Sequence, residues 1–358
     1  MREKQLLKIF AVSDIHGHLT VLKKALSDAG FKPNFAGHLL LVLGDIFDRG
    51  RENRALLDFL DGISNKVMLY GNHDGILLDA LCTHSVGRLQ TRNGTDITIS
   101  EFFPSYIGNG VLVPKTAEDR ASYNRLMGYI GSLSFLFETD HYIFTHGWLP
   151  MDDEGIAPDY EYTRYGKWDY ATWQRWYNFY GRFDIPKGKT LVVGHSSAVY
   201  GVDFDEGRSE SDYSTFFGER FIAIDGTVPR SGRINVLVIE DTVDMPETYD
   251  VGTEREGLDE ILKGGKRVFL ELFTPDMRQI KVGDIFEITD GRRTHRRRVT
   301  SLHAYSTFAQ LEDDFESYEL GFGYDRYPGY LAGEMRKLYR FEDVVEYGAI
   351  AIVTAPVD

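Results

Sequence analysis

The chain has 358 residues, of which 42% are hydrophobic and 27% are charged, so it is long enough for two domains or for one large domain with an appendage. Its formal net charge of −15 argues against a dedicated nucleic-acid coat or a membrane-surface protein, although a local basic face can exist within an acidic chain. The single cysteine excludes an intrachain disulfide, and a charged N-terminus without an apolar run of about 20 residues predicts a cytoplasmic protein.

The N-terminal part of the chain alternates between short apolar runs and segments with leucines at helical spacing. Strands are predicted at residues 8–13, 39–43 and 66–70, and helices at 19–29 and 52–61. Each strand runs into a polar cluster, which reads DIHG after the first, GDIFDRG after the second and GNHD after the third. Because parallel strands end at one edge of an open α/β sheet, we expect a site at that edge.

The middle of the chain has a weaker pattern. Residues 75–131 predict an apolar helix, a strand-like piece at 92–100 and a helix at 122–130. Strands then follow at 141–145 and 190–193, and they end in His146 and His195. The aromatic segment 168–180 between them is typical of a helix whose rings pack on a sheet. Two more strands, at 221–224 and 234–239, are predicted to form a hairpin that closes a second sheet.

The composition changes after residue 240. Residues 241–255 are acidic and lack apolar periodicity, which predicts a linker between a domain at 1–240 and a second domain at 256–358. The second domain is predicted to be a small α+β unit with a hairpin turn at Asp290-Gly291. Its strands are expected at 267–273, 284–289, 296–302 and 349–353, and its helices end near 262, 313 and 338.

Six residues of metal-ligand type follow the predicted strands: Asp14, His16, Asp45, Asn72, His146 and His195. A pair of divalent ions about 3.5 to 4 Å apart needs one bridging carboxylate and further oxygen and imidazole ligands. Asp14 and His16 are expected to hold one ion, Asp45 to bridge, and the other three to hold the second. Any one of these residues alone is better explained as a structural residue. Together they would leave unpaired polar groups in one crevice, which favours a metal site.

The motifs DIHG, GDIFDRG, GNHD, THG and GHS, in that order, resemble those of the calcineurin-like metallophosphoesterases over about residues 6–240. The DRG version and NGTDITIS at 93–100 are similar to the phosphoprotein phosphatase branch, which includes bacterial protein phosphatases and symmetrical dinucleoside tetraphosphatases. The resemblance implies a two-sheet α/β sandwich flanked by helices. It also implies the same six metal ligands and two divalent ions, with Mn²⁺ expected and Fe, Zn or Ni as alternatives.

The resemblance also implies catalytic roles. His73 would be the general acid that protonates the leaving oxygen, Asp48 would orient it, and Arg49 would grip the phosphoryl oxygens. Arg175 lies in a segment similar to the family's tryptophan-x-arginine motif, so it is either a second phosphate clamp or an ordinary surface arginine. Asp74 stands where the protein-phosphatase branch usually has glutamate, which leaves the substrate class open.

The C-terminal sequence resembles an ASCH domain, a PUA-like β-barrel fold associated with RNA. The resemblance rests on IKVGDIFEI at 280–288, RRRVTSLHAYSTFAQL and YRFEDVVEYGAIAI at 339–352. The family's Gly-x-Lys-x-x-Glu-x-Arg segment keeps Gly264 and Lys266, whereas Phe269 and Glu271 do not match it. We therefore expect no amidohydrolase activity. The arginines of the hairpin at 290–298 are expected either to contact phosphates or to be solvated.

The primary hypothesis is a dinuclear phosphatase of the serine/threonine phosphoprotein type, in which a metal-activated hydroxide attacks a phosphomonoester in line. A dinucleoside polyphosphate, a nucleotide or an RNA end is the alternative substrate. A scaffold that binds RNA or protein without turnover is the alternative of another class, and the intact set of His73, Arg49 and metal ligands argues against it. The expected partners are a phosphorylated substrate and, weakly, RNA through the C-terminal domain, but no membrane.

Overall fold

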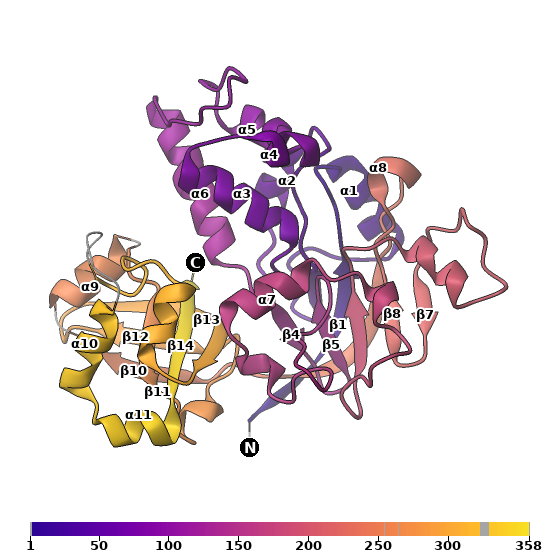
Figure 1. Ribbon diagram of the computed structural model, residues 1–358. Coiled ribbons are helices and arrows are strands. Elements are labelled where there is room, and N and C mark those ends of the chain that lie inside the picture. The colour runs from indigo at the N-terminus through magenta and orange to yellow at the C-terminus, as the bar shows by residue number, and fades with distance from the viewer. Residues whose placement is uncertain (1, 254, 264, 323–328, 358) are drawn as a thin grey trace. The chain divides into compact units, whose positions relative to one another are not determined.

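The computed structural model describes residues 2–253, 255–263, 265–322 and 329–357 (Figure 1). The chain divides into two compact units. The N-terminal unit comprises Glu3–Ile156 and Asp169–Asp244, and the C-terminal unit comprises Arg2, Ala157–Trp168 and the described residues from Met245 onward. Among the described helices, none has the length and apolarity needed to cross a bilayer.

The N-terminal unit contains two sheets. The first has the order β3-β2-β1-β9, in which β1 to β3 are parallel and β9 is antiparallel to β1. Its strands are β1 (Lys4–Val12), β2 (His38–Val42), β3 (Lys66–Met68) and β9 (Leu237–Asp244). The second has the order β4-β5-β6-β8-β7, in which β5, β6 and β8 are parallel. Its strands are β4 (Leu136–Glu138), β5 (Tyr142–Thr145), β6 (Thr190–Val193), β7 (Phe216–Gly218) and β8 (Phe221–Ala223).

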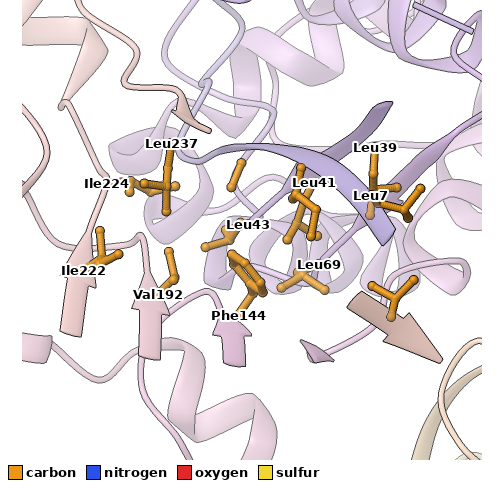
Figure 2. Close-up of a cluster of buried hydrophobic side chains, with 13 residues drawn as sticks. Leu7, Leu39, Leu41, Leu43, Leu69, Phe144, Val192, Ile222, Ile224 and Leu237 are labelled. Carbon is orange, nitrogen blue, oxygen red and sulfur yellow. The ribbon is translucent and has the colours of Figure 1, made fainter. Parts of the chain in front are cut away.

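The main core of this unit lies between the two sheets (Figure 2). Alternate residues of β1 and β2 belong to it, as Leu7 and Leu41 do, and they pack in one cluster with Phe144 and Val192 from the second sheet. Most of the intervening residues toward the carboxyl ends of these strands, such as Phe10 and Leu40, are also buried. Strands buried on both faces read as continuous apolar runs, which explains why their positions could be predicted. The expected two-sheet α/β architecture is confirmed for this unit.

Helices of the N-terminal unit are α1 (Leu19–Asp28), α2 (Asn53–Asp61), α3 (Asn72–Thr83), α4 (Arg88–Asn93), α5 (Thr95–Phe102), α6 (Ala117–Gly131) and the short α8 (Val228–Ser231). The helices α3 to α6 contact one another and form a helical group, in which α5 also packs on α2 (Figure 1).

The prediction of a strand-like piece at residues 92–100 is wrong, because most of this segment is helix α5. Its alternation of threonine and isoleucine imitates strand periodicity, yet the residues that are buried are Thr95, Thr98, Ile99 and Phe102, at helical spacing. Gly94 starts the helix with a left-handed φ of +88°. The two buried threonine hydroxyls find an acceptor in the functional site, which outweighs the low helix propensity of threonine.

The prediction of a hairpin between residues 221–224 and 234–239 is also wrong. β8 pairs with β6 and β7, whereas β9 pairs with β1 in the other sheet. The connection contains α8, and the amide of Asn235 donates to the carbonyls of Ile224 and Tyr213. These side-chain bonds replace the ladder that a hairpin would form, so the chain passes from one sheet to the other.

The aromatic helix predicted at 168–180 ends early. Helix α7 covers Tyr165–Thr172, and a 3₁₀ turn, η2, follows at Trp176–Asn178. The N–H of Trp148 donates to the carbonyl of Ala171, and the carbonyl of Trp173 lies 3.2 Å from Nε2 of His195. These carbonyls bond outside the helix and so cannot continue its i to i+4 ladder.

The C-terminal unit is built on one five-stranded sheet with the order β10-β12-β13-β14-β11. The strands are β10 (Thr248–Gly252), β11 (Val268–Leu272), β12 (Ile285–Thr289), β13 (Thr294–Tyr305) and β14 (Ala349–Pro356). The α-helices are α9 (Arg255–Leu262), α10 (Tyr330–Leu338) and α11 (Phe341–Tyr347). The 3₁₀ segments are η4 (Met277–Gln279) and η5 (Phe308–Asp313). Buried clusters lie on both faces of this sheet. The residues predicted as an acidic linker hold the end of β9 and all of β10.

Residues 157–168 interrupt the sequence of the N-terminal unit and pack in the C-terminal one. The short 3₁₀ helix η1 (Tyr160–Tyr162) begins this segment. His303 on β13 bonds to the carbonyl of Thr163 at 2.8 Å, and the ring of Tyr165 lies 5.5 Å from that of Phe315. No composition change marks this segment in the sequence, so it could not be assigned to the second unit beforehand.

Candidate metal centre

The structure brings all six predicted metal ligands together at the carboxyl ends of the strands. Asp14 and His16 follow β1, Asp45 follows β2, and Asn72 is the first residue of α3. From the second sheet, His146 follows β5 and His195 follows β6. The order of the strands in each sheet therefore explains why residues far apart in the sequence share one site.

The backbone around this site is strained. Six non-glycine residues of the predicted metal and catalytic set have positive φ values between 46° and 75°, namely Asp14, His16, Asp45, Asp48, Arg49 and His195. A side chain in the left-handed region costs free energy, of order 1 to 3 kcal/mol in strained cases. Such residues gather at functional sites because the surrounding fold holds side chains in positions that relaxed turns cannot provide.

Asp45 lies at the middle of the group. Its Oδ1 is 3.4 Å from Nε2 of His146, and its Oδ2 is 3.8 Å from Nε2 of His16 and 3.9 Å from Nε2 of His73. The backbone N–H of His73 also donates to Oδ1 at 3.0 Å. Two sets of potential ligand atoms share this carboxylate: His16 and His73 on one side, and His146 and His195 on the other. Asp45 is thus placed where one carboxylate can serve both sets.

Asp14 completes the side that contains His16. Its Oδ1 is 4.0 Å from Nε2 of His16, and its Oδ2 accepts from the N–H of His195 at 2.9 Å and from the hydroxyl of Ser13. Gly194 allows this approach, because a Cβ there would lie 2.6 Å from Oδ2 of Asp14. The carboxylate therefore connects the ends of the two sheets.

The histidine rings are oriented by backbone carbonyls. Nδ1 of His16 bonds to the carbonyl of Phe47 at 2.8 Å, and Nδ1 of His146 bonds to that of Leu43 at 2.6 Å. A carbonyl only accepts, so these nitrogens carry the protons. In the neutral ring, Nε2 of each is then left as an acceptor that points into the site.

Around Asn72, several acceptors face one another. Nε2 of His195 donates to the carbonyl of Trp173, which leaves its Nδ1 as an acceptor 2.8 Å from Oδ1 of Asn72. Nε2 of His146 lies 3.0 Å from the same oxygen. Two imidazole lone pairs and one amide oxygen repel one another unless a cation lies between them. This donor set fits a divalent metal ion.

Burial and the neighbouring charges shift the pKa values of the group in opposite directions. Burial raises the pKa of Asp14, and it lowers that of His195 to about 3 and that of His16 well below its usual value. Burial also opposes ionisation of Asp45, but the surrounding imidazoles, with His146 first, hold the pKa of this carboxyl below its usual range. Neutral imidazoles and an ionised central carboxylate are the forms that bind metal.

His73 and Asp48 form a separate hydrogen-bonded pair beside the predicted metal ligands. Nδ1 of His73 donates to Oδ2 of Asp48 at 2.7 Å, and both side chains are buried. Burial lowers the pKa of His73, but the charge of Asp45 and the bond to Asp48 outweigh it and raise the pKa above its usual value. The pair resembles a catalytic histidine and the carboxylate that orients it, because Nδ1 is held by Asp48 and Nε2 is the nitrogen that can exchange a proton.

Two threonines that the sequence did not single out hold Asp48 in place. The hydroxyls of Thr95 and Thr98, both on α5, donate to its two oxygens at 2.8 and 2.7 Å. They are fully buried. The threonines stand inside NGTDITIS, but nothing in that string reveals their partner, because the contact depends on how α5 packs against the turn after β2.

The two predicted phosphate clamps differ in their surroundings. Arg49 is exposed, and its Nη2 lies 3.0 Å from Nε2 of His73, so it is at the site. Arg175 is exposed as well, but its Nη1 donates to the hydroxyl of Tyr177 at 3.0 Å. The structure therefore joins Arg49 to the pair of His73 and Asp48, whereas Arg175 is engaged by a neighbour in its own segment.

A family model for the calcineurin-like phosphoesterases matches residues 7–223. The chain belongs to this family. As a calcineurin-like phosphoesterase it is a hydrolase of phosphoesters, and the family implies divalent metal ions, which the donor set around Asp45 fits.

Similar proteins include phosphohydrolases of different substrate classes. A stretch of 73 residues is 37% identical to the symmetrical bis(5'-nucleosyl)-tetraphosphatase of Thioalkalivibrio sulfidiphilus, covering 20% of this chain and 26% of that enzyme. This phosphoesterase thus matches about a quarter of the length of that relative. Among solved structures, a putative diadenosine tetraphosphatase is 17% identical, with 66% of this chain and 93% of that one covered and a TM-score of 0.41. A Saccharomyces cerevisiae protein serine/threonine phosphatase with similarity to human phosphatase PP5 is 14% identical, with coverages of 68% and 82% and a TM-score of 0.41.

Proposed function

We propose that this phosphoesterase is dinuclear and that the centre around Asp45 is its active site. The observation that carries the proposal is the placement of the Asp45 carboxylate between two sets of ligand atoms. A pair of ions about 3.5 to 4 Å apart requires such a bridging carboxylate. When bound, the ions supply positive charge to the phosphoryl oxygens and activate water.

In this proposal, Asp14 and His16 would hold one ion, Asn72, His146 and His195 would hold the other, and Asp45 would serve both. His73 also lies within reach of the first set. We assign it to proton transfer because its Nε2, the nitrogen that faces this set, already accepts from the Arg49 guanidinium, and a cation there disfavours a metal ion at the same nitrogen. Mn²⁺ is the proposed ion, with Fe, Zn or Ni as alternatives, since three imidazoles favour ions softer than Mg²⁺.

His73 is proposed to protonate the leaving oxygen from Nε2, with Asp48 holding the ring through Nδ1. Arg49 now donates to that same Nε2. The guanidinium therefore has to turn from His73 to the phosphoryl oxygens when substrate binds, which its exposed position permits. Arg175 is proposed as a second residue that binds the phosphoryl oxygens, which requires its hydrogen bond to the hydroxyl of Tyr177 to break.

For the substrate, we propose a dinucleoside polyphosphate. The support is the segment that is 37% identical to a symmetrical bis(5'-nucleosyl)-tetraphosphatase. A phosphoserine or phosphothreonine protein, the substrate of the primary hypothesis from the sequence, is the second candidate, because the DRG and NGTDITIS motifs resemble a branch that includes both kinds of enzyme. Both reactions use the same parts, because each breaks a bond between phosphorus and an oxygen that His73 can protonate.

The test is a substrate panel under chelator-controlled metal. Phosphopeptides, diadenosine tetraphosphate, and 5′-, 3′- and cyclic nucleotides are incubated with the full chain and Mn²⁺. We expect turnover of diadenosine tetraphosphate that EDTA abolishes and Mn²⁺ restores. Preferential turnover of phosphopeptides would favour the second candidate substrate. Absence of metal-dependent turnover for every substrate of the panel would contradict the proposed function.

For the C-terminal unit, we propose an ASCH-like module with a PUA-type sheet that positions substrate and contributes no chemistry. Support comes from the sequence resemblance and from a five-stranded sheet whose strand β13 carries an irregularity between Val299 and Ser301. Of the motif residues in its Gly-x-Lys segment, Gly264 lies outside the described residues. Within the described residues, the clusters suited to a metal ion lie in the N-terminal unit.

Binding of RNA by this unit is proposed to be weak, because much of its hairpin charge is already used. Arg297 is buried and bonds to Thr354, and Arg293 pairs with Asp290 and Asp259. Neutralising Arg292 together with Arg296, which is exposed although it pairs with Glu287, should flatten the salt dependence of single-stranded RNA binding, by roughly 0.7 log units for each phosphate that the variant no longer neutralises. An unchanged slope, measured by fluorescence anisotropy, would remove the RNA role.

A further inference from the structure

The helical group contains a hollow that none of the proposed roles uses. It has a volume of about 570 Å³. Small-molecule sites typically enclose about 300 to 1,000 Å³, so the hollow is large enough for a nucleoside-sized group. Among the residues that line it are Arg51, Asp96, Ile97, Ser100, Tyr106 and Ile107.

The hollow adjoins the residues proposed to handle the phosphoryl group. Arg51 follows Arg49 by two residues, and Gly94 packs so closely on Arg49 that a Cβ would lie 2.6 Å from its backbone nitrogen. Helix α5 connects the two places. Its buried face holds Asp48 through Thr95 and Thr98, and its other face lines the hollow. A group in the hollow would thus lie next to the segment that carries Asp48 and Arg49.

The lining combines three kinds of chemistry. Asp96 supplies a carboxylate, of the kind that accepts hydrogen bonds from ribose hydroxyls in nucleotide sites. Arg51 supplies a guanidinium suited to phosphate oxygens. Tyr106 and Ile107 supply a ring and an apolar wall suited to a flat base. Ile107 is 77% exposed, so covering it with a base would remove apolar surface from water and favour binding.

We propose that this hollow binds the nucleoside on the leaving-group side of the substrate, with Asp96 on the ribose, Arg51 on the bridging phosphates and Tyr106 with Ile107 on the base. The inference rests on the proposed function and deepens it, because it makes the substrate class depend on α5 and the loop that follows. A peptide side chain is the competing occupant.

The test uses adenosine as the probe, with the full chain in EDTA. Adenosine has no phosphate and needs no metal, so this binding measurement is independent of whether the enzyme hydrolyses anything. We expect a Kd of about 1 mM by titration calorimetry or ligand-observed NMR. Asp96→Asn and Ile107→Ser should each weaken binding by about tenfold. Val111→Ser is the matched control, since Val111 is 54% exposed on the same loop but does not line the hollow.

A second readout separates the occupants. The ratio of kcat/KM for diadenosine tetraphosphate to that for nitrophenyl phosphate should fall about tenfold in Asp96→Asn and in Ile107→Ser, and should not change in Val111→Ser. Circular dichroism checks that the variants are folded. If one of the two variants does not fold, the other alone tests the inference. Three results would overturn the inference. The wild type and the folded variants could bind adenosine equally, or no adenosine could bind at about ten times the expected Kd. In the third, excess peptide alone displaces bound adenosine.

Discussion

At the residue scale, the site depends on side chains held in positions that the local sequence would not choose. Asp48 accepts hydrogen bonds from His73, Thr95 and Thr98, and its own N–H bonds to Asn53. A buried carboxylate with this many donors is fixed in one orientation. The direction of Nε2 of His73 therefore follows from α5 as much as from the GNHD turn.

Replacing His73 tests its role as the acid. His73→Ala should lower kcat by roughly 10²- to 10⁴-fold, the usual contribution of a positioned general acid. The loss should be much smaller on nitrophenyl phosphate than on an alkyl phosphate, because an acidic leaving group needs no proton. Steady-state kinetics on the two esters measure this. Equal losses on both would argue against proton donation by His73.

Thr98 is predicted to be a positioning residue that touches neither substrate nor metal. Thr98→Val removes the hydrogen bond to the buried carboxylate of Asp48, worth roughly 1.5 to 3 kcal/mol, and also an acceptor of the N–H of Asp48. It should lower kcat about tenfold or more with little change in KM. Thr98→Ser keeps the hydroxyl and should restore the rate. If the serine variant were as slow as the valine variant, packing and not the hydrogen bond would be responsible.

His303 gives a pH dependence that is separate from the metal centre. It is fully buried, and burial lowers its pKa from 6.5 to about 4. The unfolded chain takes up a proton below pH 6.5 and the folded chain only near pH 4, so stability is present above pH 6.5 and is lost as the pH falls toward 4. The loss amounts to about 3 kcal/mol.

The measurement is the urea midpoint of the full chain between pH 7 and 4.5. His303→Gln keeps a donor for the carbonyl of Thr163 but cannot titrate, so it should flatten the pH dependence of the midpoint. His295→Gln, at a less buried position of the same strand, should flatten it less. An unchanged slope in His303→Gln would show that another group titrates.

At the scale of elements, the sequence predicted those strands whose position is determined by a local run of apolar residues. The strands β2 and β6 are buried on both faces, and their apolar runs end within one or two residues of the predicted bounds. The six ligand-type residues could be found because each follows a strand that the sequence predicts. Helix α5 and the crossover between β8 and β9 could not be predicted, since the first depends on an acceptor in another segment and the second on side-chain bonds from Asn235.

At the scale of the whole molecule, the sequence order does not match the compact units. Residues 157–168 belong to the C-terminal unit through Thr163 and Tyr165. A chain cut near Asp244 would leave this segment without the partners it packs against. Point variants in the full chain are therefore the sounder way to separate the roles of the two units.

Metal should stabilise the fold of the whole chain. The centre holds two buried aspartates, and its inward-facing acceptors repel one another without a cation. Binding to the folded state alone contributes about 2.7 kcal/mol at a hundredfold excess over Kd. Calorimetric scans should show a higher Tm with Mn²⁺ than with EDTA. The same Tm in both would mean that the folded chain does not bind the ion.

The central claim is that Asp45 bridges two ions, and metal stoichiometry tests it most directly. Equilibrium dialysis with Mn²⁺ is compared for the wild type, Asp45→Asn and the surface control Asp28→Asn, together with hydrolysis of nitrophenyl phosphate. We predict two ions per chain in the wild type and the control, and weakened binding at both sites with loss of activity in Asp45→Asn. Two ions bound with unchanged affinity and full activity in Asp45→Asn would contradict the account.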